Sequence, residues 1–424
     1  MTNPQTPHTH SRTNQQETVA LWLVALGLGG FVLFFPLGIS LREIFAVIAG
    51  IGLVLMHALG YRHSYLKFFP IKGLYFLFLG LLIFKTLHSI DPSSGLYALK
   101  TNAYKAFLLF LVGIECCRSP LSLRRLLFLF VFMGVYEGLD GVWQGLNGID
   151  LIKGEPLVGH RLTGSMDSAR VGNLMALTTP LAFALPAALP RIRSRAVGLI
   201  LIAAACAPQL YLLAGSGTRS GMVGVAAALA AFLLIRRFRW VLPSMAALGG
   251  ASLSALIFNT GRLSIERLMS DHRLLDVWPI AWGVFKKYPL LGTGLNTFDK
   301  AYKMLGFTPH VMKSALGHPH NIYLQFLCET GIVGFAILLL FLGGTALWSA
   351  RRIREGLDKG SNTRHWIITA AFWSSYVGYL ATAMTAHNFF RSWWLGLAMT
   401  ILGVTLGACL HGLHLDRKAF KDVS

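Results

Sequence analysis

Residues 321–349 read NIYLQFLCETGIVGFAILLLFLGGTALWS and form an apolar stretch that follows directly on His320. An α-helix needs about 20 predominantly apolar residues to cross the hydrocarbon core of a membrane. The sequence therefore predicts an all-α integral membrane protein with about twelve transmembrane helices. The other apolar windows of this kind are residues 18–36, 43–59, 71–88, 97–116, 124–146, 171–190, 196–214, 221–235, 240–258, 366–386 and 393–413.

The composition agrees with this fold class. Of the 424 residues, 54% are hydrophobic and 13% are charged, and the mean hydropathy is +0.57. An ordinary soluble domain has about 25% charged residues. The five cysteines predict neither a disulfide framework nor a cysteine-based metal site, because they lie in or near the apolar windows.

Lysine and arginine gather in every second loop, and short loops rich in these residues stay on the cytoplasmic side. We therefore expect both termini in the cytoplasm, with residues 1–17 as a disordered tail and residues 415–424 as a second tail. The formal charge of +20 mainly reflects this topology. Because the basic residues are scattered among apolar segments, nucleic acid is not an expected partner.

One long polar segment, residues 259–319, separates nine predicted transmembrane helices (residues 18–258) from three more (residues 320–414). By the alternation of sides, this segment faces the outer side of the membrane. Apolar side chains recur in it at helical spacing from residue 263 to residue 285, with an interruption at Pro279. The pattern predicts amphipathic helices at the membrane interface, which either line an access path for a lipid or form a structural lid.

Arg161 is the first of three candidate site residues on the outer side. It stands in GHRLTG (residues 159–164), eleven positions before Gly172. A guanidinium binds phosphate oxygens through two parallel hydrogen bonds, a geometry that lysine cannot reproduce. The alternative is an interfacial arginine that lies against lipid headgroups.

Arg219 is the second candidate, within AGSGTRSG (residues 214–221). A charged side chain in an apolar stretch is costly unless it has a partner, so a functional role is the default hypothesis. The neighbouring glycines can also offer backbone N–H groups to an anion. A structural cap on the preceding helix is the alternative.

His320 is the third candidate, in GHPHNIYLQ (residues 317–325). We expect His320 and Asn321 in the first turn of a helix, whose positive end favours anions and a neutral imidazole that can accept a proton. His318 and His320 could instead form a metal pair, although no third ligand stands nearby, or His320 could simply pack at the interface.

Further polar and basic residues would form the rim of this site. They suit an acceptor that carries phosphate groups, and they suit anionic lipid headgroups equally well. The predicted substrate-binding residues are Asn321, Arg170, His318, Lys313 and Arg391.

The spacing His320-Asn321, nine residues, Gly331, two residues, Gly334 resembles the signature of bacterial O-antigen ligases, within the O-antigen ligase and polymerase superfamily. The two glycines would allow another helix to approach closely. Glu329, inside the signature, is expected to face away from His320.

Three other patches are similar to recurrent features of that superfamily. They are Arg161 with Gly164, Arg219 in TRSG, and the turn PLLGTGLNTF (residues 289–298). The stretch between Gly164 and Arg170 departs from the superfamily pattern, because it lacks an Asn-Pro-Asn character.

This resemblance implies a GT-C-like glycosyltransferase in the inner membrane of a Gram-negative bacterium. It implies transfer of a glycan from undecaprenyl diphosphate to the lipid A core of lipopolysaccharide, at the periplasmic face and without metal, ATP or another cofactor. Arg161 and Arg219 would stabilise the departing diphosphate, and His320 would act as a base or position the reacting groups.

Three alternative functions stay open. An O-antigen polymerase uses the same donor and often has two R-x10-G loops, of which only Arg161 to Gly172 is present here. A protein O-oligosaccharyltransferase shares the histidine motif. A flippase for lipid-linked glycans belongs to a different class and would place charges along a central path through the membrane.

Overall fold

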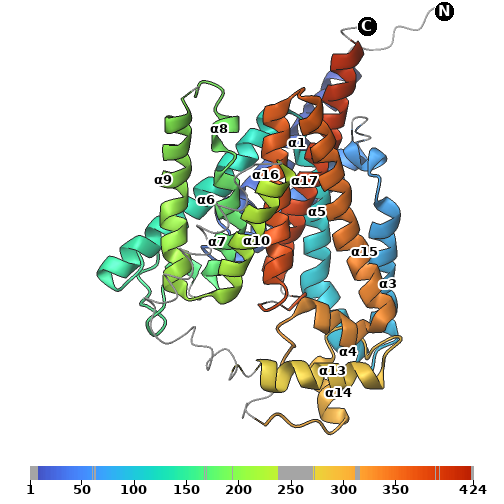
Figure 1. The fold of residues 1–424 in the computed structure, drawn as a ribbon. Helices are drawn as coiled ribbons and strands as arrows, with labels where there is room; N and C mark the ends of the chain where they lie inside the picture. The colour runs from blue at the N-terminus through green and yellow to red at the C-terminus, as the bar shows by residue number, and fades with distance from the viewer. Residues whose placement is uncertain are drawn as a thin grey trace, which may run out of the picture.

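The computed structural model describes residues 8–59, 61, 64–166, 168, 170–192, 194–236, 271, 273–310, 316–386, 388–390 and 392–421. Within these ranges the secondary structure is helical, apart from two isolated β-bridges in the loop after α6, and turns and loops connect the helices. Most of the long helices run along one bundle (Figure 1). The helices are α1 (His8–Leu33), α2 (Ile39–Ala58), α3 (Lys72–Leu87), α4 (Pro92–Ala98), α5 (Tyr104–Cys116), α6 (Pro120–Asn147), α7 (Val171–Ala182), α8 (Leu185–Ala188), α9 (Arg195–Ser216), α10 (Arg219–Ile235), α13 (Trp278–Lys287), α14 (Phe298–Met304), α15 (Ile322–Lys359), α16 (Thr363–Thr382) and α17 (Ser392–Lys421). Shorter 3-10 or π turns are η1 (Tyr65–Phe68), η2 (Leu99–Ala103), η3 (Gly164–Met166) and η4 (Arg273–Val277).

Each predicted apolar window in the described part of the chain contains helix, whereas residues 240–258 lie outside that part. Five described helices are long and apolar enough to cross a membrane, namely α2, α6, α9, α15 and α17 from Trp393 to Leu415. Residues Glu17–Leu33 of α1 and helix α10 are apolar but shorter. The fold is thus that of an all-helical membrane protein, and the count of twelve spans stays a prediction.

The structure describes helix within both predicted tails, the disordered tail at residues 1–17 and the tail at residues 415–424. Helix α1 begins at His8, so residues 8–17 continue the apolar part of α1 as helix. Residues 8–17 contain neither glycine nor proline, and an existing helix is extended at little cost. Helix α17 likewise runs through Lys421 into the predicted C-terminal tail. Both chain ends lie at the same end of the bundle (Figure 1).

Local signals explain where the helices begin and end, and α6 is an example. The Ser119 hydroxyl accepts a hydrogen bond from the Ser122 backbone N–H, and Pro120 occupies the first turn. Both features favour a helix start. Gly148, with φ of 79°, ends the helix in the left-handed conformation that glycine adopts without strain.

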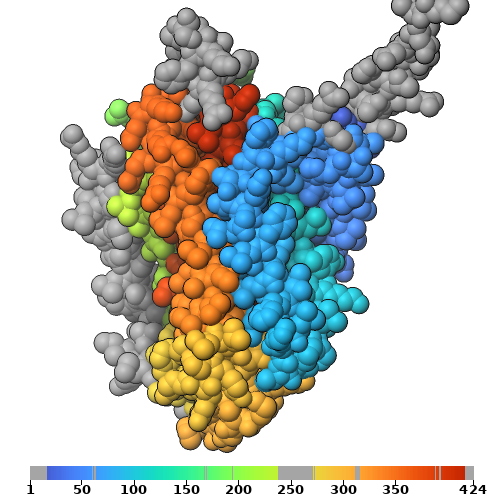
Figure 2. All heavy atoms as spheres, turned by 90° about the vertical axis from the view of Figure 1, so that its right-hand side faces the viewer, coloured from blue at the N-terminus to red at the C-terminus, as the bar shows by residue number. Residues whose placement is uncertain are grey.

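Close helix contacts form the centre of the bundle. Helix α17 packs along α5, and a Cβ atom added to Gly403 of α17 would lie 2.2 Å from the Phe110 carbonyl oxygen of α5. Glycine is therefore required for this approach of the two backbones. On another face, α3 and α15 lie side by side (Figure 2).

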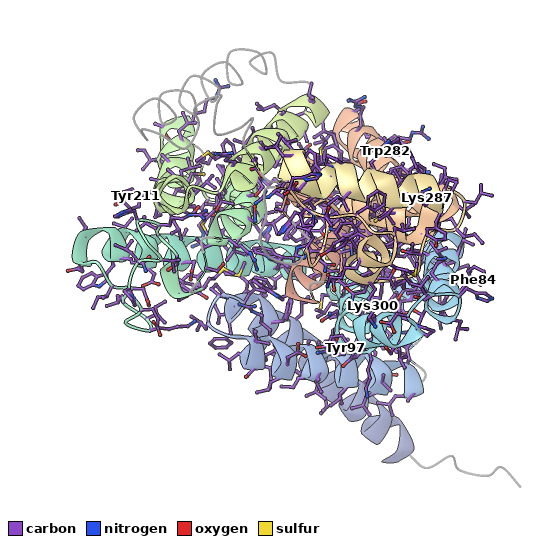
Figure 3. The ribbon with its side chains drawn as sticks, turned by 90° about the horizontal axis from the view of Figure 1, so that it is seen from below. Phe84, Tyr97, Tyr211, Trp282, Lys287 and Lys300 are labelled. Atoms are coloured by element: carbon purple, nitrogen blue, oxygen red, sulfur yellow. The ribbon has the colours of Figure 1, made fainter. Side chains whose placement is uncertain are left out.

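The segment that contains α13 and α14 covers the end of the bundle that lies opposite the two chain ends (Figures 1 and 2). Helix α13 lies across this end, with Trp282 and Lys287 along it (Figure 3). It buries Ile280, Ala281 and Val284 and exposes Trp282, as the predicted amphipathic pattern requires. Pro279 does not interrupt this helix but stands in its first turn, where a proline needs no N–H partner.

Candidate functional site

Arg161 lies against the turn between α9 and α10. Its Nε donates to the Ser216 backbone carbonyl at 2.5 Å, and the next residue, Leu162, donates its N–H to the Gly215 carbonyl at 3.1 Å. Gly217 ends α9 with a φ of 59°, and Arg219 is the first residue of α10. Arg161 thus contacts Ser216, which stands three residues before Arg219 in the chain. This turn lies at the α13 end of the bundle.

The start of α7 meets the same turn. A Cβ atom at Gly172 would lie 2.5 Å from the Ser216 Oγ, and one at Gly221 would lie 2.4 Å from the Gly172 carbonyl oxygen. The Ser220 hydroxyl also donates to Asn173 at 2.8 Å. These contacts explain the R-x10-G spacing, because both Arg161 and Gly172 contact the backbone or side chain of Ser216.

The loop that carries Arg161 is held by a buried glutamine of α6. The Gln144 Oε1 accepts the backbone N–H groups of Thr163 at 2.8 Å and Gly164 at 3.0 Å. Its Nε2 donates to the Thr163 hydroxyl and to the Glu155 carbonyl. Because Gln144 is fully buried, these four hydrogen bonds fix the loop without competition from water.

Arg273 is a candidate site residue that we did not predict. Asp271 lies between two guanidinium groups, 3.8 Å from the Arg219 Nη1 and 3.9 Å from the Arg273 Nε. The Arg273 Nη1 donates to the Thr385 carbonyl at the end of α16, at 2.7 Å. Arg273 is thus directed from the α13 segment toward the bundle, and Asp271 connects it to Arg219.

His318 and His320 lie next to this arginine group. Their ring centroids are 4.0 Å apart. Burial, with smaller contributions from Arg170 and Arg273, lowers the pKa of His318 to about 4. His318 is therefore neutral near pH 7, and its two arginine neighbours show that Arg170 and Arg273 approach the same place.

His320 itself has a backbone φ of 55°. A non-glycine residue in this left-handed region is uncommon and costs of order 1 kcal/mol or more, and such strain is concentrated at functional sites. His320 is partly exposed, and its imidazole lies against the His318 ring.

The first turn of α15 differs from the prediction. His320 and Asn321 both precede it, because Asn321 is the N-cap and its Oδ1 accepts the Leu324 N–H at 3.0 Å. Asparagine is among the strongest capping residues, so the helix starts after it. The Asn321 oxygen thus has a structural role, and the Ile322 N–H donates to the Ala383 carbonyl beyond α16.

Gly331 interrupts α15 and lies against a loop rather than against another helix. Its φ of 67° and ψ of −172° are non-helical. The freed N–H groups of Ile332 and Val333 donate to the carbonyls of Pro289 and Leu290. A Cβ atom at Gly331 would lie 2.2 Å from the Leu290 oxygen. Only Gly334 is near another helix, with its Cβ position 3.4 Å from Leu81 of α3.

The turn at residues 289–298 completes this contact. Gly294 donates its N–H to the Glu329 carbonyl at 2.8 Å, and the Asn296 N–H donates to the Glu329 carboxylate at 2.8 Å. A Cβ atom at Gly292 would lie 2.4 Å from the Glu329 carbonyl carbon. We call this contact between residues 289–296 and Glu329–Val333 the kink clamp. Glu329 takes part in the clamp, and its carboxylate also accepts hydrogen bonds from the Gln325 side chain.

Two predicted site residues, Lys313 and Arg391, lie outside the described residues, as does Asp167 near Arg170. The described residues contain no group of three or more His, Cys, Asp or Glu side chains placed to hold a metal ion.

The arrangement suits an anion with several phosphate oxygens. Helices α7, α10 and α15 all begin at the α13 end of the bundle, and a helix N-terminus carries a partial positive charge. The side chains gathered there add charge and hydrogen-bond donors: Arg161, Arg170, Arg219, Arg273, His318 and His320.

Comparisons with known proteins agree with the motifs. Residues 199–339 match the family described as O-antigen ligase. The chain is also similar to proteins provisionally named polysaccharide ligases, at 25% identity in Rickettsia typhi and 27% in Rickettsia felis, each over 209 residues. Each match covers 46% of this chain and 48% of the relative, so the chain spans about half the length of the curated relatives that it matches.

The resemblance to O-antigen ligases is thereby confirmed. The matched family segment contains Arg219, Arg273 and His320, whereas Arg161 and Arg170 precede it.

Proposed function

We propose that this chain is an O-antigen ligase that transfers a glycan from undecaprenyl diphosphate to the lipid A core of lipopolysaccharide. In this proposal the α13 end of the bundle faces the periplasm, the membrane is the inner membrane, and the reaction needs neither metal nor ATP. The observation that carries the proposal is the convergence of four arginines and two histidines with neighbouring, tilted rings at one end of a membrane bundle.

The arginines would bind the diphosphate of the donor. Arg161 and Arg219 stand on either side of the α9–α10 turn, and Arg273 reaches the same group from the α13 segment. In the transition state, negative charge develops on the departing diphosphate. Preorganised guanidinium groups stabilise that charge more strongly than they stabilise the ground state, which is what lowers the barrier.

His320 would handle the proton of the acceptor. A sugar hydroxyl of the core attacks the anomeric carbon of the donor, the new C–O bond forms, and the bond from that carbon to the diphosphate oxygen breaks. The hydroxyl proton passes to the His320 imidazole, and undecaprenyl diphosphate leaves with the electron pair. His318, held neutral beside it, would orient the His320 ring rather than exchange protons near pH 7.

The test is glycan transfer by purified protein in liposomes that contain a lipid-diphosphate-linked glycan and glycan-free lipopolysaccharide. We expect His320→Ala and Arg219→Gln to lower the rate about 100-fold or more. Lys287→Gln is the matched control, because Lys287 is exposed in the last turn of α13. Unchanged transfer by both site variants would refute the proposal.

The products also separate the alternatives. Glycan-capped lipopolysaccharide identifies a ligase. Longer lipid-linked chains identify a polymerase, glycosylated protein identifies a protein O-oligosaccharyltransferase, and movement of the glycan lipid between leaflets without any covalent product identifies a flippase.

A further inference from the structure

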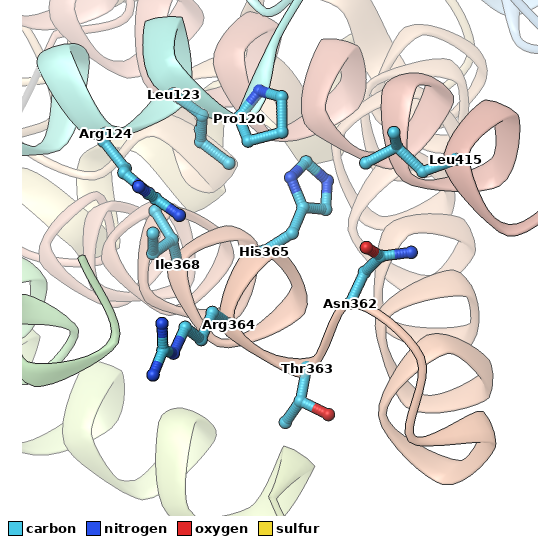
Figure 4. Close-up of a pocket in the computed structure, with 9 residues that line it drawn as sticks. All are labelled: Pro120, Leu123, Arg124, Asn362, Thr363, Arg364, His365, Ile368 and Leu415. Carbon is cyan, nitrogen blue, oxygen red and sulfur yellow. The ribbon is translucent and has the colours of Figure 1, made fainter. Parts of the chain in front are cut away.

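A cavity of about 340 Å³ lies between the start of α6, the start of α16 and the last turns of α17. Thr385, three residues beyond the other end of α16, accepts a hydrogen bond from Arg273 of the candidate site, so the cavity is at the far end of the bundle. The basic loops predict this end to be cytoplasmic. The residues that line it are Pro120, Leu123, Arg124, Asn362, Thr363, Arg364, His365, Ile368 and Leu415 (Figure 4).

We propose that this cavity binds a phosphate group, carried by an anionic phospholipid headgroup. The proposal does not depend on the proposed ligase activity, because it concerns the opposite end of the molecule and a different set of side chains.

The charges of the cavity favour an anion. Arg124 and Arg364 both line it, and none of the lining residues is acidic. The Arg124 Nε is shielded from solvent and has no hydrogen-bond partner among the residues that the structure describes. The Arg364 Nη2 makes only a long contact, 3.5 Å, with the Pro190 carbonyl. A buried donor without a partner is costly, and a phosphate oxygen would satisfy it.

The backbone of α16 adds donors to the same place. The helix begins at Thr363, and the N-cap residue Asn362 has a φ of 53° and makes no side-chain capping bond to the first turn. The Thr363 hydroxyl donates back to the Gly360 carbonyl instead of capping the helix. The first N–H groups of α16, at the positive end of its dipole, therefore add to the two guanidinium charges.

The rest of the lining is His365 and an apolar wall that comes from all three helices: Pro120, Leu123, Ile368 and Leu415. In Figure 4, Arg124 and Arg364 lie toward one side and Leu415 toward the other. A free phosphate ion would make no favourable contact with the apolar wall, whereas the glycerol and upper acyl carbons of a phospholipid would lie against it. Basic pockets between transmembrane helices on the cytoplasmic side are known to favour anionic headgroups. The combination favours the lipid as the source of the phosphate.

The test is native mass spectrometry of the full-length protein with anionic phosphatidylglycerol, and zwitterionic phosphatidylcholine, which has no net charge, is the comparison. We expect the wild-type protein to retain one phosphatidylglycerol molecule. Arg124→Gln and Arg364→Gln should each weaken the binding of this lipid about fivefold. The matched control is Arg125→Gln, since Arg125 is the exposed neighbour of Arg124 and does not line the cavity.

A second arm uses inorganic phosphate and reads the thermal stability of the protein. Stabilisation by inorganic phosphate that Arg124→Gln abolishes would support the phosphate site and assign the free ion as its ligand. Equal retention of phosphatidylglycerol by wild type, Arg124→Gln and Arg364→Gln would overturn the proposal. The proposal would also fail if Arg125→Gln lost phosphatidylglycerol as strongly as the two cavity variants.

Discussion

Replacement of Gly331 by alanine tests whether the kink clamp holds α15 to the α13 segment. The φ of 67° with ψ of −172° lies in a region that is essentially restricted to glycine, and a side chain there costs about 1–3 kcal/mol. The new Cβ would also lie 2.2 Å from the Leu290 oxygen, so that loop must move. We expect Gly331→Ala to lower the free energy of unfolding by about 2–4 kcal/mol.

The measurement is equilibrium unfolding in mixed detergent micelles, and Gly343→Ala is the matched control. Gly343 belongs to the same helix, and nothing lies within 4 Å of its Cβ position. Its replacement should leave stability unchanged or raise it by up to about 1 kcal/mol. The double variant Gly292→Ala with Gly331→Ala should cost less than the sum of the single variants, because both break one contact. If Gly331→Ala is as stable as Gly343→Ala, the clamp does not exist as described.

Three further predictions concern the candidate site. Arg273→Gln should lower the transfer rate at least tenfold with the melting temperature almost unchanged, because its guanidinium faces the site; an unchanged rate would remove it from the site. Gln144→Leu should destabilise the fold by about 1–3 kcal/mol in an unfolding titration, because it leaves the buried Thr163 and Gly164 N–H groups without acceptors. Asn147→Leu, on the exposed side of α6, should not destabilise the fold. The pKa of His318 is about 4 in the folded chain, below its ordinary value of about 6.5. Between pH 4 and pH 6.5 the unfolded chain therefore binds more protons at this residue than the folded chain does. Stability should therefore fall as the pH is lowered from 6.5 to 4, and His318→Gln should show a smaller fall over that interval.

The sequence predicted the helices well because membrane helices leave a direct signal, a long apolar run. The assignment of Arg161, Arg219 and His320 to one site came from the resemblance to O-antigen ligases and stays a prediction. Arg273 had no such signal. It stands in an amphipathic stretch among other charged residues, and its contact with Thr385 joins positions 112 residues apart. Only the tertiary fold identifies it.

The glycines of the signature show a second limit of sequence reasoning. Two glycines three residues apart on an apolar helix predict a close helix contact. Gly331 instead adopts a non-helical conformation, and the loop at Pro289 and Leu290 takes over the freed N–H groups. A spacing alone does not distinguish these cases, because both need a residue without a side chain.

The kink clamp gives the fixed spacing between His320 and Gly331 a mechanical reason. The first part of α15, from Ile322 to Gly331, rises about 1.5 Å per residue, so it holds Ile322 at about 14 Å from the clamp, with His320 two residues before it. The clamp also fixes the start of the turn at Pro289, which follows α13 and the Arg273 turn in the chain. The part of α15 before Gly331 therefore sets the position of the histidine pair at its start. Through the clamp at its other end, it also sets the position of Arg273. A change in length between Asn321 and Gly331 would rotate His320 by about 100° per residue relative to Arg273, which is why the spacing, and not only the residue types, carries the site.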